Sequence, residues 1–82
     1  MPEIFRFYGF SFFFYSREHD PIHVHVEGSG GAAIFYWNGS QFELKSNKGV
    51  KPNDLKRITK VIDDNKDIIV KLWNLHFGKE SL

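Results

Sequence analysis

A chain of 82 residues is long enough for one domain and too short for two, so we expect residues 1–82 to form a single domain. Hydrophobic residues make up 41% of the chain and cysteine is absent, which predicts a core without disulfides or thiolate ligands and fits a reducing, cytoplasmic setting. The net charge is only +1, and no apolar run is long enough to predict a signal peptide or a membrane span.

Two short aromatic strands are predicted near the start of the chain. Residues 4–8 and 10–16 are rich in phenylalanine and tyrosine, and Gly9 between them favours a turn. Pro21 ends the loop that follows, because proline lacks an N–H and keeps the preceding residue out of helical geometry. We therefore expect a third strand to begin directly after Pro21.

The third predicted strand, residues 22–27, alternates strictly between apolar and polar side chains. Successive residues of a strand point to opposite faces of the sheet. The core face is expected to carry Ile22, Val24 and Val26, and the opposite face His23, His25 and Glu27.

A fourth strand and a hairpin are predicted next. The glycine-rich segment 28–31 is typical of a flexible connection, and residues 32–37 have strand composition. Asn38-Gly39 favours positive φ at both central positions of a hairpin turn, which leads into a fifth strand over residues 41–45. The residues of this hairpin expected in the core are Ala33, Phe35 and Trp37.

Helical spacing replaces strand alternation in the second half of the chain. Apolar residues recur every three or four positions, which predicts a helical region over residues 52–77 that ends before Gly78. The polar run 63–67 interrupts the apolar stripe, so one helix and two helices both fit. The predicted fold is α+β: a four- to five-stranded antiparallel meander sheet over residues 3–45, packed by one or two C-terminal helices.

Three of the four histidines lie within seven positions. His23 and His25 share a strand face with Cα atoms about 6.5 Å apart, which is close enough to bind one divalent metal ion such as zinc. Glu27 continues this face but lies about 13 Å from His23, too far to share that ion in a straight strand. The expected third ligand is His19 from the preceding loop or a residue from elsewhere in the fold.

The same histidines can also act without a metal. Imidazoles titrate near neutral pH, so His19, His23 and His25 can serve as general acid and base in phosphodiester cleavage, with Arg17 stabilising charge on the phosphoryl group. A third interpretation gives His23 and His25 no chemical role and leaves them as half-exposed strand residues. The residue pattern fits all three interpretations.

Positive charge is concentrated in residues 45–60, which hold six lysine and arginine residues against one aspartate. Such a stretch can contact the phosphates of RNA. Since no aromatic residues are interleaved with these charges, a solvated loop and the first turns of a helix are the interpretation that we favour. The candidate binding residues are Lys48, Lys51, Lys56 and Arg57.

Two motifs carry a resemblance to a known family. The opening Met1-Pro2-Glu3-Ile4-x-Arg6-Phe7-Tyr8-Gly9 and the later His19-x-Pro21-x-His23-x-His25-Val26 resemble a family of small bacterial proteins known as domain of unknown function 4160. The resemblance implies that the family's histidines fall on His19, His23 and His25 and its late tryptophan on Trp73. The chain departs from the family pattern at Ile22, where a second proline is usual, and at Val24, where phenylalanine is usual.

The resemblance implies no established activity, but such proteins are associated with toxin–antitoxin-like gene pairs. One hypothesis is a toxin–antitoxin-type component that acts on RNA or on a cognate small protein through the histidines. The other is a non-catalytic module that uses the same histidines to bind a metal ion or a partner. An edge strand of so small a sheet also offers a place for a second copy of the chain or for a cognate protein.

Overall fold

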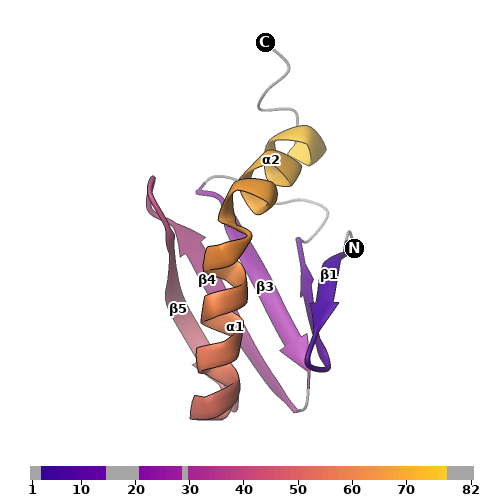
Figure 1. Ribbon diagram of the computed structural model, residues 1–82, viewed down its shortest axis with the longest axis vertical. Coiled ribbons are helices and arrows are strands. Elements are labelled where there is room, and N and C mark those ends of the chain that lie inside the picture. The colour runs from indigo at the N-terminus through magenta and orange to yellow at the C-terminus, as the bar shows by residue number, and fades with distance from the viewer. Residues whose placement is uncertain (1–2, 15–20, 29, 78–82) are drawn as a thin grey trace.

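Five strands and two helices follow one another along the chain. The computed structural model describes residues 3–14, 21–28 and 30–77. The elements are β1 (Glu3–Phe7), β2 (Phe10–Phe13), β3 (His23–Gly28), β4 (Gly31–Trp37), β5 (Phe42–Lys48), α1 (Pro52–Asp64) and α2 (Lys66–Phe77). The strands pair antiparallel in chain order, so the sheet is a meander (Figure 1). The predicted α+β fold class is confirmed.

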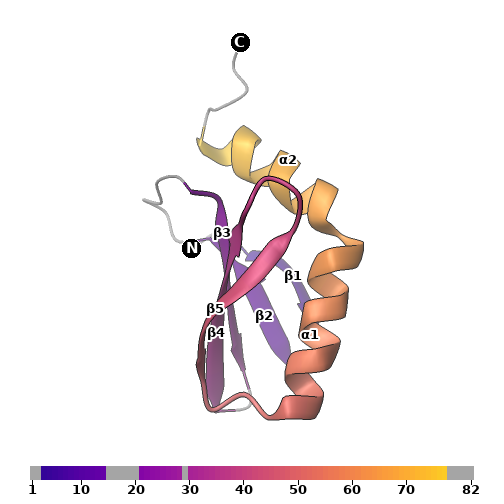
Figure 2. The ribbon, with the colours of Figure 1, turned by 90° about the vertical axis from the view of Figure 1, so that its left-hand side faces the viewer.

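The elements form two layers. α1 covers one face of the sheet, and α2 continues beyond it and leans over one end of the sheet (Figure 2). The face toward α1, which we call the inner face, buries its apolar side chains against the helices, which removes them from water. The central buried residues are Phe10, Phe12, Phe14, Val24, Val26, Ala33, Phe35, Ile58, Ile62, Ile69 and Trp73.

The predicted alternation of the central strands is confirmed. Val24 and Val26 are fully buried, and Ile22 packs against the core from the start of the strand. On the neighbouring strand, Ala33 and Phe35 are buried on the same face. Strand alternation therefore leaves the histidines of β3 on the opposite face, away from α1.

The β4–β5 connection is a hairpin, as predicted, but its turn differs from the prediction. Of Asn38 and Gly39, only Gly39 has positive φ, at 105°. The Asn38 side chain instead accepts hydrogen bonds from the backbone N–H groups of Ser40 and Gln41, at 2.8 and 2.9 Å. The prediction of positive φ at both positions was wrong because the asparagine amide, rather than the backbone alone, organises the turn.

A turn with positive φ at both central residues occurs instead between β1 and β2. Tyr8 has φ 53° and Gly9 has φ 77°, and a left-handed conformation is uncommon for an aromatic residue. The guanidinium of Arg57 lies 4.7 Å from the centre of the Tyr8 ring. This cation–π contact from α1 helps to hold the turn in place.

The interruption of the apolar stripe produces two helices. α1 begins at Pro52, where proline's missing N–H costs nothing, and Asn65 separates it from α2. The Asn65 side chain donates a hydrogen bond to the Val61 carbonyl at 2.8 Å, which occupies an acceptor at the end of α1. Neither helix in the described part of the chain is long and apolar enough to span a membrane.

Candidate functional site

The sheet face opposite α1, which we call the outer face, carries the histidines. Strand register places Phe13, His25, Ile34 and Ser46 in one row across the sheet, and Ser11, Glu27, Ala32 and Lys48 in the next. His23 is paired with Tyr36 in a third row. Side chains in neighbouring rows of one face are close enough to touch, so the outer face is a continuous surface of mixed chemistry.

Four rings contact one another in sequence across the outer face. The rings of His23 and His25 have centroids 5.2 Å apart. Phe13 stacks on His25 at 5.5 Å, and Tyr36 stacks on His23 at 4.8 Å. Because each imidazole has an aromatic neighbour on its far side, both rings are held in defined positions. The structure thus brings the predicted pair His23 and His25 together.

His23 is the more buried histidine of the pair, at 8% exposure. Besides Tyr36, its ring contacts Trp73 of α2, with centroids 5.3 Å apart. The interpretation of both histidines as half-exposed strand residues is therefore wrong for His23, because α2 reaches over the start of β3. His25 is partly buried, and its Nε2 atom is shielded from solvent.

A backbone hydrogen bond orients the His23 ring. Nδ1 of His23 lies 2.8 Å from the carbonyl oxygen of Pro21. A carbonyl oxygen can only accept, so Nδ1 carries the hydrogen, and the neutral ring then has its basic lone pair on Nε2. Metal-binding histidines are commonly fixed by this kind of bond from their second nitrogen. Pro21 therefore sets the tautomer of His23 as well as the entry into β3.

Beside His25 the outer face is hollowed. A pocket of about 250 Å³ lies between β3 and β5, where the small Ala32 of β4 leaves space below the neighbouring side chains. It is lined on one side by His25 and Glu27 and on the other by Ser46 and Lys48. An imidazole, a carboxylate, a hydroxyl and an ammonium group thus surround one small space.

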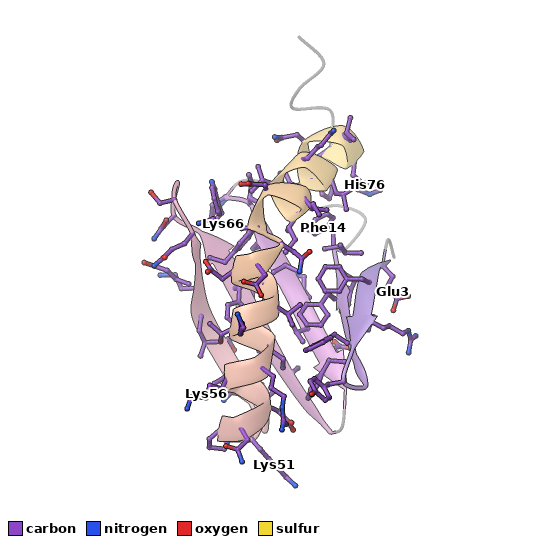
Figure 3. The ribbon with its side chains drawn as sticks, viewed as in Figure 1. Glu3, Phe14, Lys51, Lys56, Lys66 and His76 are labelled. Carbon is purple, nitrogen blue, oxygen red and sulfur yellow. The ribbon has the colours of Figure 1, made fainter. Side chains whose placement is uncertain are left out.

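The other predicted site residues fall into two groups. Arg17 and His19 lie outside the described residues, and within residues 3–14, 21–28 and 30–77 no three His, Asp or Glu side chains are grouped to hold a metal ion. Lys51, Lys56 and Arg57 are exposed at the start of α1. Lys51 and Lys56 lie at the end of the molecule opposite His76 (Figure 3). Of the four basic candidates, only Lys48 is on the histidine face.

Sequence reasoning missed two neighbours of the histidines, Phe13 and Tyr36. The strand alternation that placed Phe35 in the core also placed Tyr36 on the outer face, so this contact was accessible from the pattern. The contact of Phe13 with His25 depends on the register between β2 and β3, which the sequence does not specify.

These features define the class of protein: a small α+β domain with an antiparallel meander sheet, helices on one face and a histidine pair on the other. The chain belongs to the family described as Domain of unknown function (DUF4160), whose model matches residues 9–74. The predicted family membership is confirmed. No curated protein and no solved structure matches the chain.

Proposed function

We propose that this protein is a metal-binding module in which His23 and His25 supply two ligands to a divalent cation of the zinc class. The observation that supports this most strongly is the hydrogen bond from His23 Nδ1 to the Pro21 carbonyl, which directs the lone pair to Nε2. Two imidazoles that share a tetrahedral zinc ion at about 2.0–2.1 Å have ring centroids about 5 Å apart. The spacing of 5.2 Å between His23 and His25 agrees with that value.

The third ligand in this proposal is His19, the remaining histidine of the motif. Imidazole is a preferred ligand of zinc, and three protein ligands leave a fourth position for water or for a partner's side chain. The surrounding rings of Phe13, Tyr36 and Trp73 would limit access of water to the bound ion. Metal binding at this position would fix the loop before β3 to the sheet.

Thermal unfolding of untagged protein, with and without zinc, tests the proposal. Zinc at about 100 times its dissociation constant should stabilise the fold by about 2.7 kcal/mol, which for a domain of this size raises the melting temperature by about 10–20 °C. His23→Phe and His25→Phe keep an aromatic ring but remove the ligand nitrogen, so each should abolish most of the shift. His76→Ala, which removes the exposed histidine of α2, is the matched control and should keep it. A wild-type shift below 2 °C, or equal shifts in all four proteins, would contradict metal binding by this pair.

A second candidate function, a toxin–antitoxin-type component that acts on RNA, has its own supporting observation. Lys48 and His25 line the same pocket on the outer face. A lysine ammonium can bind a phosphate while a nearby imidazole transfers a proton, the combination needed for metal-independent phosphodiester cleavage. In this proposal His23, His19 and Arg17 assist His25, and a cognate small protein would neutralise the activity.

Expression in a bacterial host tests this second candidate. The wild-type chain should slow growth, while the triple variant His19→Ala, His23→Ala and His25→Ala should not. Lys48→Gln should also relieve the growth defect, whereas Lys51→Gln, an equal charge change away from the histidine face, should leave it unchanged. Equal growth with the wild-type and triple-variant proteins at matched expression would rule this function out.

A further inference from the structure

The two helices differ in how their apolar side chains are distributed. In α1, the exposed residues from position 53 onward are all polar or charged. α2 buries Ile69 and Trp73 against the sheet, but it also exposes Ile68, Leu72 and Leu75, at 54%, 37% and 63%. A helix that is apolar on more than one side is typical of a helix that is covered on those sides. The second apolar side of α2 therefore indicates an interaction surface.

Ile68, Leu72 and Leu75 form one stripe, which we call the α2 stripe. Their spacing of four and then three residues places them on the same side of a helix. They are three of the five large apolar side chains that are exposed in the described part of the chain. α2 projects beyond the end of the sheet, so a partner can reach this side of it (Figure 1).

Two charged residues lie beside the α2 stripe. Asp67 precedes Ile68 by one position, Lys71 precedes Leu72 by one position, and both charged residues are exposed. The other acidic residues of the two helices are in ion pairs: Asp54 with Arg57, Asp63 with Lys66 and Asp64 with Lys60. Among the residues that the structure describes, no ion pair includes Asp67 or Lys71. One negative and one positive group are thus available to a partner.

The balance of these two charges bears on the kind of partner. A nucleic acid or an anionic membrane surface would be favoured by an excess of cationic side chains next to the stripe. Asp67 and Lys71 cancel each other, so this surface has no such excess. A protein surface with an apolar row and one charge of each sign is complementary to it. The α2 stripe with Asp67 and Lys71 is itself such a surface.

Two copies of α2 match one another when they pack antiparallel about a two-fold axis. This symmetry brings the same flank of both helices together and places an early position of one helix against a late position of the other. An axis at position 70 puts Ile68 against the partner's Leu72, and an axis at position 69 puts Asp67 beside the partner's Lys71. The two axes differ by one residue, about 1.5 Å along the helix, which the side chains can span. One arrangement therefore buries apolar residues and forms two ion pairs.

A parallel arrangement lacks this charge match. It would bring opposite flanks of the two helices together, and the flank of the stripe opposite Lys71 carries His76, which has no carboxylate to offer. Complementary charge across an interface favours the correct orientation and suppresses the others. The charges on α2 therefore select the antiparallel pair.

We propose that α2 mediates a homodimer in which two copies of the chain pack antiparallel through the α2 stripe. Ile68 of each copy contacts the partner's Leu72, Asp67 pairs with the partner's Lys71, and Leu75 lies at the rim. The interface is small, so the dissociation constant should lie between about 1 μM and about 1 mM, the range of weak, transient complexes. The dimer goes beyond metal binding and does not require it, because its contacts come from α2 alone.

Sedimentation velocity of the untagged full-length chain, from about 10 μM to about 1 mM and with EDTA present to exclude metal, tests the proposal. Asp67→Lys and Lys71→Asp each place like charges across the two-fold axis. Leu72→Gln removes the apolar contact without a change of charge. Lys56→Asp is the matched control, because it reverses an exposed cation on α1 instead of α2. Thermal unfolding of each variant verifies that it is folded.

The wild-type chain should dimerise as its concentration rises. Each charge reversal on α2 should weaken the dimer by about tenfold or more, Leu72→Gln by about fivefold or more, and Lys56→Asp by less than about twofold. An equimolar mixture of the Asp67→Lys and Lys71→Asp chains should dimerise as the wild type does, because a chain with two cations then meets a chain with two acids.

Three results would overturn the proposal. They are a monomeric wild-type chain at about 1 mM, equal affinities of the wild type and both charge variants, and a mixture of the two charge variants that associates no better than either alone. Co-sedimentation of a monomeric wild-type chain with vesicles that contain phosphatidylglycerol would assign the α2 stripe to a membrane surface and also overturn it.

Discussion

Replacement of Trp73 by alanine should remove a large part of the stability of this domain. Trp73 is fully buried, and its ring contacts Phe14, Phe77 and His23 with centroids 5.2, 4.4 and 5.3 Å away. Truncation of a buried tryptophan to alanine costs about 3–5 kcal/mol, whereas a domain of 82 residues has a total stability of about 4–12 kcal/mol. Trp73→Ala should therefore leave the protein close to its unfolding threshold.

Urea denaturation followed by far-ultraviolet circular dichroism measures this loss. The urea midpoint is the free energy of unfolding divided by the slope, and the slope depends mainly on chain size. The loss of stability in Trp73→Ala should therefore be measured as a sharp fall in the midpoint. Trp73→Phe should lose less stability than Trp73→Ala, because phenylalanine keeps an aromatic ring at this position. It also removes a buried Nε1–H that meets no acceptor among the described residues. Leu75→Ala, on the exposed side of α2, is the control and should change stability by less than about 0.5 kcal/mol. A loss below 1 kcal/mol in Trp73→Ala would refute the packing of α2 against the sheet.

Three further substitutions test local features. His23→Asn places an amide donor near the position of Nδ1, so without metal it should retain about 0.5–1.5 kcal/mol more stability than His23→Ala, as measured by chemical denaturation. Gly28→Ala should destabilise the fold by about 1–3 kcal/mol in the same assay, because its Cβ would collide with the Gly9 carbonyl oxygen; an unchanged midpoint would contradict the close approach of these two turns. Asn47→Ala should cost about 1–2 kcal/mol, because its amide exchanges two hydrogen bonds with the Val50 backbone, and faster amide hydrogen exchange at Val50 would report their loss.

The fold was predictable because local periodicity and burial agree. In β3, the alternation of apolar and polar residues placed Val24 and Val26 in the core, where both are fully buried. In the helices, three- and four-residue spacing identified the side that packs on the sheet, represented by Ile58 and Ile62. Each pattern depends only on neighbouring residues of one element, so a single sequence contains it.

The environment of the histidines was less predictable because it depends on distant residues. Alternation placed His23 and His25 on one face, but the burial of His23 results from contacts with Tyr36 and Trp73. The latter contact requires α2 to lean over the start of β3, which no local pattern specifies. Similarly, the basic residues formed one group in the sequence, but the structure separates them. Lys48 lines the same pocket as His25, whereas Lys51, in the turn between β5 and α1, lies outside that pocket.

The central claim, that Pro21 orients His23 for metal binding together with His25, is tested most directly by two-bond ¹H–¹⁵N nuclear magnetic resonance of the histidine side chains. Without metal, His23 should show the tautomer protonated at Nδ1, as its hydrogen bond to the Pro21 carbonyl requires. One equivalent of zinc should shift the Nε2 resonance of His23 and a ring nitrogen of His25, while His76 stays unchanged. A His23 ring protonated at Nε2, or spectra of His23 and His25 that zinc does not alter, would contradict the claim.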